Sequence, residues 1–407
     1  MRKLELLSPA GDMSKLKTAF YYGADAVYVG GKRFSLRALA GNFTDEELLE
    51  ATEYAHSLGK KIYVTVNIFA RDTDLKQAEE YFKYLESIKI DGAIISDPGL
   101  IYLCRKVAPN LTVNISTQAN TLNSMTVEFW KEQGAKRVIL ARELSLKEIE
   151  GISKAVPDIE IETFIHGAMC IAYSGRCLLS DYKTGRSSNR GACVQACRWN
   201  YEIREVGSNG EFMQIEEDER GTYILNSKDL NLIDYIAELD RAGVCSFKIE
   251  GRMKSEYYLA TVINAYRRAI DAYYACGKQY KENPLFNEEL LKTAHRDFTT
   301  AYFLGENDRT VNYDDSQSKG THKFIANVLD YNEQEGYALV EMRNRFEVGE
   351  TLEVLSPSDA FNSQIKVEKL TDHKGEEVKV AKLVQQVLRL YTDIKLAKGD
   401  ILRRKEI

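Results

Sequence analysis

The sequence predicts an α/β protein whose main domain is a TIM-like (β/α) barrel. Eight short apolar strands alternate with amphipathic helices between the N-terminus and about residue 255. Such alternation predicts a parallel sheet with right-handed crossovers, and eight units in about 250 residues match the size of a closed barrel. After residue 321 short alternating strands are separated by turns, which predicts a separate small antiparallel β-barrel.

Each predicted strand of the main domain is a short apolar run that ends at a polar turn. The eight runs are 4–9, 25–31, 61–67, 92–98, 112–117, 137–143, 159–167 and 245–251. Helices lie between them, such as the one predicted after Thr44, a candidate N-cap. In this helix Leu48, Ala51 and Ala55 share one face, and Gly59 marks its end.

One connection is much longer than the others. Nearly 80 residues separate the seventh run from the eighth. This connection holds the cysteine insertion (167–222) and two further predicted strands, WNYEIREV and TYILNS. An insertion after a barrel strand lies at the C-terminal rim, where TIM-barrel active sites lie. We therefore divide the chain into a barrel domain (1–255), a helical extension and linker (256–320) and a C-terminal β-barrel domain (321–407). The extension begins with one long predicted helix, and a second is predicted over 282–298.

Four of the seven cysteines lie within 28 residues: Cys170, Cys177, Cys193 and Cys197. Cys104, Cys245 and Cys276 are scattered and are predicted to be small core residues. Four thiolates suit a tetrahedral zinc ion or a cubane iron–sulfur cluster. The spacing C-x6-C-x15-C-x3-C favours the cluster modestly, because the first pair is wider than a zinc knuckle. The spacing alone does not exclude zinc as the bound metal. Four thiols that bind no metal are the less favoured alternative.

Three strands supply the candidate catalytic side chains Glu162, His166, Arg142 and Glu250. Alternation along the seventh strand places Glu162, Phe164 and His166 on one face, where a buried Glu162 needs a cation and Arg142 is the candidate. His166 lies at the end of this strand, beside the cysteines. It is a candidate catalyst, and a hydrogen-bonded structural role is an equally weighted alternative. Glu250 lies in KIEGRMK, where charged residues share one face. The alternative for that face is a salt-bridged rim.

The C-terminal ends of barrel strands converge on one mouth, so polar residues at these ends are candidate substrate contacts. The candidates at strand ends are Asn67, Gln118, Lys32, Lys248 and Arg252, and candidate phosphate contacts are Arg37, Arg198, Lys183, Arg186 and Arg190. The turns SPAGD and VGGKRFSLR pair glycine with cations, a weak phosphate motif. The alternative is that these glycines provide a positive φ angle.

Composition and missing motifs exclude several classes of protein. The net charge is −6, whereas a general nucleic-acid coat protein is basic, so any RNA binding requires a local patch. No apolar run reaches the roughly 18 residues of a membrane span, and the N-terminus lacks a signal-like apolar run. We therefore expect a cytoplasmic protein with no membrane partner. The motifs H-E-x-x-H and G-x-S-x-G are absent.

Several longer motifs resemble a known family. ETFIHGAMCIAYSGRCLLS (162–180), GACVQACRWNY (191–201), NSKDL (226–230) and FKIEGRMKS (247–255) are similar to blocks of the collagenase-like peptidase family, peptidase family U32. LLSPAG and GADAVYVGG near the start belong to the same resemblance, which covers essentially the whole chain. The appended barrel makes the chain most similar to the branch that forms 5-hydroxyuridine in tRNA.

This resemblance implies an iron–sulfur-dependent tRNA uridine 5-hydroxylase that acts at the wobble position, independently of oxygen and linked to prephenate metabolism. It implies a [4Fe–4S] cluster on the four clustered cysteines, with zinc as the less favoured occupant. The implied partners are tRNA, with its uridine flipped out of the stack, and a prephenate-derived small molecule. Partners for electron transfer and cluster assembly stay unidentified. The alternatives are a collagenase-like peptidase, for which no nucleophile–base pair is visible, and a non-catalytic zinc-containing RNA-binding protein.

Overall fold

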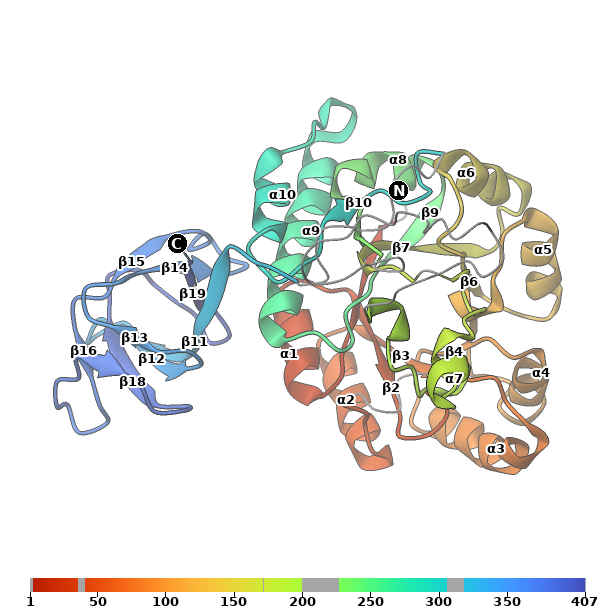
Figure 1. Ribbon diagram of the computed structural model, residues 1–407, viewed down its shortest axis with the longest axis horizontal. Helices are drawn as coiled ribbons and strands as arrows, with labels where there is room; N and C mark the ends of the chain where they lie inside the picture. Colours follow the sequence, from red (N-terminus) through yellow and green to blue (C-terminus); the bar gives the residue numbers. More distant parts are fainter. Residues whose placement is uncertain (1–2, 36–40, 171, 200–226, 306–317, 407) are drawn as a thin grey trace, which may run out of the picture.

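Eight parallel strands close into a barrel in the computed structural model, which describes residues 3–35, 41–170, 172–199, 227–305 and 318–406 (Figure 1). The strands are β1 (Glu5–Pro9), β2 (Ala26–Gly30), β3 (Lys61–Val66), β4 (Gly92–Ile95), β5 (Val113–Ile115), β6 (Arg137–Ile139), β7 (Glu160–Ala168) and β9 (Val244–Ile249). Strands β1 to β7 pair in chain order, and β9 closes the ring by pairing with both β7 and β1. The predicted TIM-like barrel is confirmed, and each of the eight predicted barrel strands overlaps an observed one.

Helices cover the outside of the barrel (Figure 1). They are α1 (Met13–Tyr21), α2 (Asp45–Ser57), α3 (Asp72–Ser87), α4 (Pro98–Val107), α5 (Ser124–Glu132), α6 (Leu146–Ala155), α8 (Ile236–Arg241) and α9 (Glu256–Cys276). Helix α2 begins as predicted, because the Thr44 hydroxyl accepts a hydrogen bond from the Glu47 N–H in a capping box. Leu48, Ala51 and Ala55 are buried, so the predicted apolar face packs against the barrel.

Two short strands extend the sheet beyond the barrel, and the sequence does not predict them. Strand β8 (Asp229–Asn231) runs antiparallel to β7, and β10 (Phe298–Thr299) pairs with β8. The helix expected over 282–298 is only α10 (Pro284–Leu290), since the chain then turns into β10. Strands of two or three residues are too short to show a period of two. The strands predicted in the insertion fall almost wholly within 200–226, outside the described residues.

The C-terminal region is an antiparallel sheet with a core of its own. Its strands are β11 (His322–Asn332), β12 (Tyr337–Met342), β14 (Thr351–Leu355), β15 (Gln364–Lys366), β16 (Leu370–Thr371), β18 (Val387–Tyr391) and β19 (Ile401–Lys405), paired in the order β15-β14-β19-β11-β12-β18-β16. Strands β13 (Phe346–Glu347) and β17 (Val380–Ala381) form a separate ribbon. The prediction of a separate antiparallel unit is confirmed.

Polar contacts attach this sheet to the barrel domain. The Arg403 side chain is fully buried, and its Nη2 lies 2.9 Å from a carboxylate oxygen of Glu289 on α10. The Tyr21 hydroxyl of α1 donates to Asp400 over 2.8 Å. Because a buried ion pair tolerates little displacement, the two units are held in one arrangement.

Two of the three scattered cysteines are core residues, as predicted. Cys104 and Cys245 are buried, whereas the prediction is wrong for Cys276, which is exposed as the last residue of α9. None of the described helices combines the length and the hydrophobicity that crossing a membrane requires.

Candidate active site

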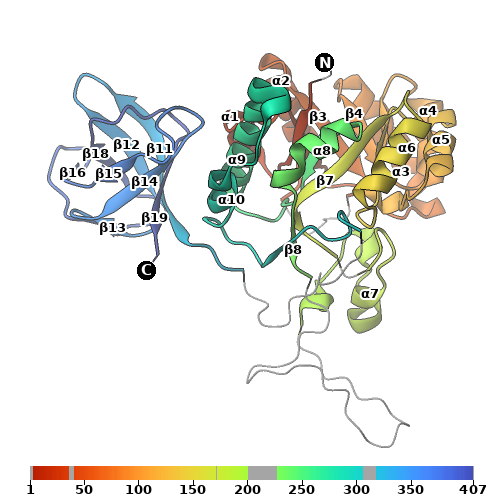
Figure 2. The same ribbon diagram turned by 90° about the horizontal axis from the view of Figure 1, so that it is seen from above.

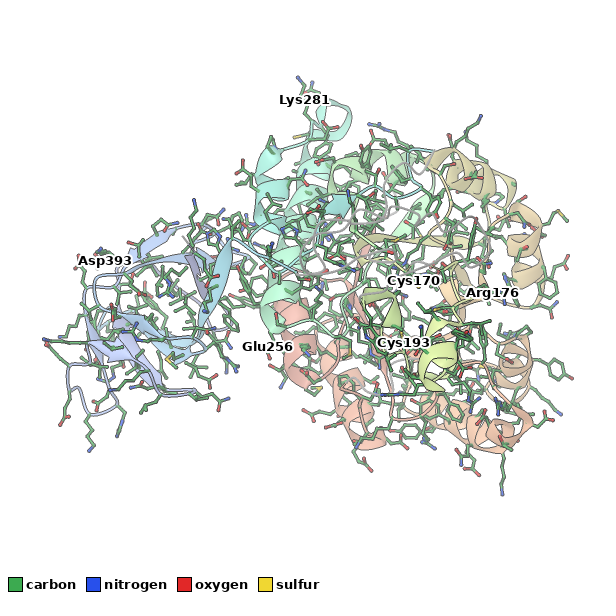
Figure 3. The ribbon with its side chains drawn as sticks, in the orientation of Figure 1. Cys170, Arg176, Cys193, Glu256, Lys281 and Asp393 are labelled. Atoms are coloured by element: carbon green, nitrogen blue, oxygen red, sulfur yellow. The ribbon has the colours of Figure 1, made fainter. Side chains whose placement is uncertain are left out.

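The four clustered cysteines line one cavity of about 270 Å³ at the C-terminal end of β7. The segment that carries them includes α7 (Leu179–Thr184), which projects from this end of the barrel (Figure 2). Cys170 and Cys193 lie close together beside α7 (Figure 3). The structure therefore brings together, at the rim predicted for an active site, residues that are up to 27 positions apart in the sequence.

The first half of the cysteine segment is attached to the barrel rim through Ser174 and Gly175. The Ser174 N–H donates to the Glu143 carboxylate over 2.9 Å. Gly175 has a φ of +76°, and a Cβ atom there would lie 2.2 Å from the Gln118 carbonyl oxygen. Both the backbone conformation and the close approach therefore require glycine.

The second half of the cysteine segment is attached to the loop after β3. The Arg190 guanidinium donates to the Phe69 carbonyl over 2.7 Å and to the Asp74 carboxylate over 2.9 Å. Ser188 and Asn189 both donate to the Cys177 carbonyl, over 2.8 and 3.1 Å. Arg190, a predicted phosphate contact, is thus occupied in holding the cysteine cavity together.

A hydrogen bond joins the first two cysteines. The Cys170 thiol donates to the Cys177 sulfur, which lowers the pKa of Cys177 to about 5 and raises the pKa of Cys170. Burial opposes ionisation of Cys177, while the N–H groups of Leu179 and Ser180 and the Ser188 hydroxyl favour it. This lowered pKa favours the thiolate of Cys177, and the thiolate is the form that binds metals.

The four sulfurs surround the cavity and do not meet at one point. Among the residues that the structure describes, no three His, Cys, Asp or Glu side chains lie close enough together to hold a single ion. A tetrahedral zinc needs its sulfur ligands at about 2.3 Å from one centre. Four cysteines placed around a cavity suit a cubane cluster, whose irons are spread over a larger volume. All four cysteines line one cavity, so this donor set could hold the predicted cluster.

A second cavity of about 100 Å³ occupies the barrel mouth. The structure gathers six of the predicted residues around it: Asn67, Gln118, Arg142, Lys248, Glu250 and Arg252. Thr117, Gln118, Arg142 and Glu250 line this cavity and also the cysteine cavity. The two cavities are therefore neighbouring parts of one site, with the cysteines at its outer end and the barrel mouth at its inner end.

Arg142 lies at the junction of the two cavities. Its guanidinium is 3.7 Å from the centre of the Phe164 ring and donates to the Ala168 carbonyl over 2.6 Å. Its Nη2 lies 3.9 Å from the Glu250 carboxylate. The Tyr28 hydroxyl donates a hydrogen bond to the same Oε2 atom of Glu250 over 3.4 Å. A fixed cation and a fixed carboxylate thus face the space between the cavities.

The predicted pairing of Glu162 with Arg142 is wrong. The Glu162 carboxylate is 1% exposed and lies 2.9 Å from both Arg137 Nη1 and Lys248 Nζ. Arg137 starts β6, so its side chain reaches Glu162 from the closed end of the barrel, whereas Arg142 lies beyond the end of β6. Lys248 also lines the mouth, and it connects this buried ion network to the site.

His166 points away from the site. The β7–β9 register shifts between Phe164 and His166, so that Phe164 pairs with inward-facing Lys248 but His166 pairs with Ile249. The bulge turns the histidine away from the barrel interior and toward helix α9. There it is 1% exposed, and its Nδ1 lies 3.4 Å from the Tyr266 hydroxyl. Burial lowers its pKa to about 3. His166 lines neither cavity, so the structure gives it a packing position and the expected shared face with Phe164 is wrong.

The glycine-rich turn after β2 makes room for Arg252. A Cβ atom on Gly30 would lie 2.2 Å from the Arg252 guanidinium, which donates to Ser35 over 2.7 Å. Neither Gly30 nor Gly31 has a positive φ, so the glycine is needed for space and not for that conformation. Lys32 is exposed and lines neither cavity. Arg37 and the side chain of Arg198 lie outside the described residues.

Tyr28 and Thr65 line the mouth, and the sequence reasoning missed them. Their signal was available, because each lies two residues before a strand-end residue, Gly30 or Asn67, on the same face. Lys254 and Met253, which line the cysteine cavity, follow the KIEGR motif in a loop. No strand period predicts the direction of loop side chains.

Comparisons with known proteins cover nearly the whole chain. The family model "Peptidase family U32" matches residues 11–313, and "Peptidase family U32 C-terminal domain" matches residues 320–403. The chain is 43% identical to "tRNA hydroxylation protein P1" of Bacillus subtilis (strain 168), over 99% of this chain and 95% of that protein. It is 41% identical to "tRNA hydroxylation protein P" of Escherichia coli (strain K12), over 94% and 92%. It is 34% identical to "Collagenase" of Porphyromonas gingivalis (strain ATCC BAA-308 / W83), over 74% of each chain.

Proposed function

This chain belongs to peptidase family U32, and from that premise we propose that it is an enzyme that hydroxylates tRNA. Two relatives that align over more than nine-tenths of the chain carry names for tRNA hydroxylation. The observation that carries the proposal is the shared wall of Thr117, Gln118, Arg142 and Glu250 between the cysteine cavity and the barrel mouth. A base held in the mouth would lie beside the cysteines.

The reaction that we propose is formation of 5-hydroxyuridine at the wobble position. The uridine leaves its stack and enters the mouth, where the amides of Asn67 and Gln118 can pair with the polar edge of the uracil. The C5–H bond is replaced by a C5–OH bond, so the base loses two electrons. An organic oxygen donor gives up its oxygen atom and gains these two electrons, which makes the reaction independent of O₂.

The oxygen donor that we propose is a prephenate-linked organic acid. Arg142 and Arg252 line the mouth, and guanidinium groups bind carboxylates through paired hydrogen bonds. Glu250 lies between the mouth and the cysteines and can accept a proton during the exchange. These residues bind and orient the two reactants and leave the redox chemistry to a cofactor.

The cofactor that we propose is a [4Fe–4S] cluster held by Cys170, Cys177, Cys193 and Cys197. When bound, such a cluster would supply electron transfer. The support is the single cavity that all four cysteines line. Since the substrate that we propose is tRNA, we also propose that the protein works in the cytoplasm.

Mass spectrometry of tRNA nucleosides tests this function. A strain that lacks the gene, and any paralogous gene, is complemented with wild type, Cys170→Ala or the exposed control Cys276→Ala. We expect wild type and Cys276→Ala to restore 5-hydroxyuridine-derived nucleosides and Cys170→Ala to abolish them. Unchanged nucleosides in the deletion strain would rule the proposal out.

A collagenase-like peptidase is the second candidate, because the chain is 34% identical to a relative named "Collagenase". In the described part of the chain, no histidine lines either cavity, so the usual cysteine or serine nucleophile with a histidine base is not assembled there. Gelatin cleavage by purified protein that disappears in Cys170→Ala but persists in Cys276→Ala would favour the peptidase. Zinc without iron or sulfide after anaerobic purification would favour the zinc-containing RNA-binding protein.

A further inference from the structure

We infer that an exposed aromatic and basic surface beside the cysteine cavity holds the unpaired nucleotides that flank the target base. This inference rests on the proposed function, since it names the surface that would present the RNA to the site. The rim surface, as we call it, consists of Tyr173, Leu178, Tyr182, Trp199, Arg176, Lys183 and Arg186. All of them lie on the cysteine segment.

The apolar part of the rim surface is unusually exposed. Tyr182 is 85% exposed, Leu178 is 70% exposed and Tyr173 is 54% exposed. Of the five aromatic side chains that are exposed in the described part of the chain, three belong to this surface. Large exposed apolar groups that gather in one place indicate a binding surface, whereas scattered ones are ordinary.

The rim surface is continuous with the cysteine cavity. Tyr173 lines the cavity wall and is also half exposed outside it. Leu178 and Tyr182 lie one helical turn apart, since the Tyr182 N–H donates to the Leu178 carbonyl over 2.9 Å, and they flank the cavity-lining Leu179. Arg176 is exposed and directly precedes the cavity-lining Cys177 in the chain. A chain that leaves the cavity would therefore cross these side chains.

The charge of the segment is opposite to that of the rest of the protein. Residues 170–199 contain five arginine or lysine residues and one aspartate, a net charge of +4, so the remainder of the chain carries −10. Arg176, Lys183 and Arg186 are exposed. A local cationic patch on an acidic protein attracts a polyanion to that patch alone.

The mixture of cations and aromatic rings favours RNA over a protein partner. Aromatic residues and arginine are also enriched in protein interfaces, so the rings alone do not select the partner. The net charge of +4 on this segment favours RNA, because single-stranded RNA is bound by stacking of its bases on aromatic rings with cations along its phosphate backbone. Stacking requires unpaired bases. The partner that fits the rim surface is therefore a single-stranded RNA loop and not a duplex.

Binding of two RNA probes to the anaerobically purified full-length protein tests this inference. One probe is a hairpin whose unpaired loop carries the target uridine, and the other is a fully paired duplex of the same composition. The variants are Tyr182→Ala, Tyr182→Phe and the control Tyr102→Ala, which removes a tyrosine that is 72% exposed on α4. We expect Tyr182→Ala to weaken hairpin binding about 5- to 150-fold, the loss of one base stack, with little change for the duplex. Tyr182→Phe and Tyr102→Ala should bind like wild type.

The outcomes separate this inference from the proposed function. Equal hairpin affinity for Tyr182→Ala and Tyr102→Ala, or wild-type protein that binds the duplex as tightly as the hairpin, overturns the inference. If Tyr182→Ala lowers the iron content and leaves hairpin affinity unchanged, Tyr182 supports the cysteine cavity and does not bind RNA, and the inference is also overturned. The proposed function fails independently, when wild type does not restore the hydroxylated nucleoside to the deletion strain.

Discussion

The two ends of the barrel interior both carry charged side chains, and the two cavities of the candidate site lie at the C-terminal end. At the closed end Arg137 is 4% exposed and ion-paired to Glu162, Glu5 and Glu160. Five residues later Arg142 lies at the junction of two cavities, with its nearest carboxylate 3.9 Å away. Both arginines belong to the same strand and its extension. A charged side chain that is buried in tight ion pairs, such as Arg137, stabilises the fold. One that lines a cavity without a tight ion pair, such as Arg142, is available to bind a substrate.

The largest effect on stability is expected at the closed end. Arg137→Leu leaves the buried Glu162 without one of its two cations, and we expect the free energy of unfolding to fall by about 3–5 kcal/mol. Arg142→Leu should cost at least about 2 kcal/mol less, because its neighbouring carboxylate is not in a tight ion pair. Denaturant unfolding of both variants measures the difference. Equal losses would remove the distinction between the two ends.

The next effect concerns how the cysteine cavity is attached to the mouth. Gly175→Ala places a Cβ atom 2.2 Å from the Gln118 carbonyl oxygen and strains a positive φ, which we expect to cost about 1–3 kcal/mol locally and to detach this loop. Gly185→Ala is the matched control, with φ +67° and nothing within 4 Å of the added atom. Hydrogen exchange of residues 172–177 and the hydroxylated nucleoside should change only in Gly175→Ala. Identical behaviour of the two variants would contradict this attachment.

A smaller effect follows from the pKa of His166, which burial lowers from an ordinary value near 6.5 to about 3. Below pH 6.5 the unfolded chain binds a proton at this histidine that the folded protein does not bind. Stability from this group is therefore complete above pH 6.5 and falls as the pH drops toward 3, by up to about 1.4 kcal/mol per pH unit. Between pH 6.5 and 5 we expect wild type to lose about 1–2 kcal/mol more of its free energy of unfolding than His166→Gln does. The other histidines are present in both proteins, so their contributions cancel in this difference. If the free energy of unfolding fell by the same amount in both proteins as the pH dropped, His166 would not be buried as described.

The smallest effect is expected at Lys32, which is exposed and lines neither cavity. Lys32→Ala should change the free energy of unfolding by less than about 0.5 kcal/mol. The level of hydroxylated nucleoside should stay within about twofold of wild type, a difference of less than about 0.4 kcal/mol. A larger loss in nucleoside analysis would restore the sequence-based assignment of Lys32 to substrate binding.

Much of the mouth could be predicted because the geometry of a parallel barrel is regular. Once the eight strands are recognised, their C-terminal ends must converge, so Asn67, Gln118 and Arg252 could be placed together without a structure. His166 and the partner of Glu162 could not. A single β-bulge reverses the direction of the His166 side chain. The ion-pair partner of Glu162 depends on the stagger between neighbouring tilted strands, which sets the residues that lie at the same level in the barrel.

The glycines show the same limit in a different way. Gly30 and Gly175 could be recognised as turn residues, but their close neighbours, Arg252 and Gln118, come from other strand ends. Local sequence reports local conformation, and it contains no signal for which distant group occupies the space beside a glycine.

The central claim is that the cysteine cavity and the barrel mouth form one hydroxylating site, and Arg142 tests it most directly because it lines both cavities. The measurement is mass spectrometry of tRNA nucleosides from the deletion strain complemented with Arg142→Gln, together with the iron content of the purified variant. We expect a loss of at least about 100-fold in the hydroxylated nucleoside, roughly 2.7 kcal/mol of transition-state stabilisation, with iron retained at the wild-type level. A wild-type level of hydroxylated nucleoside in Arg142→Gln would contradict the account.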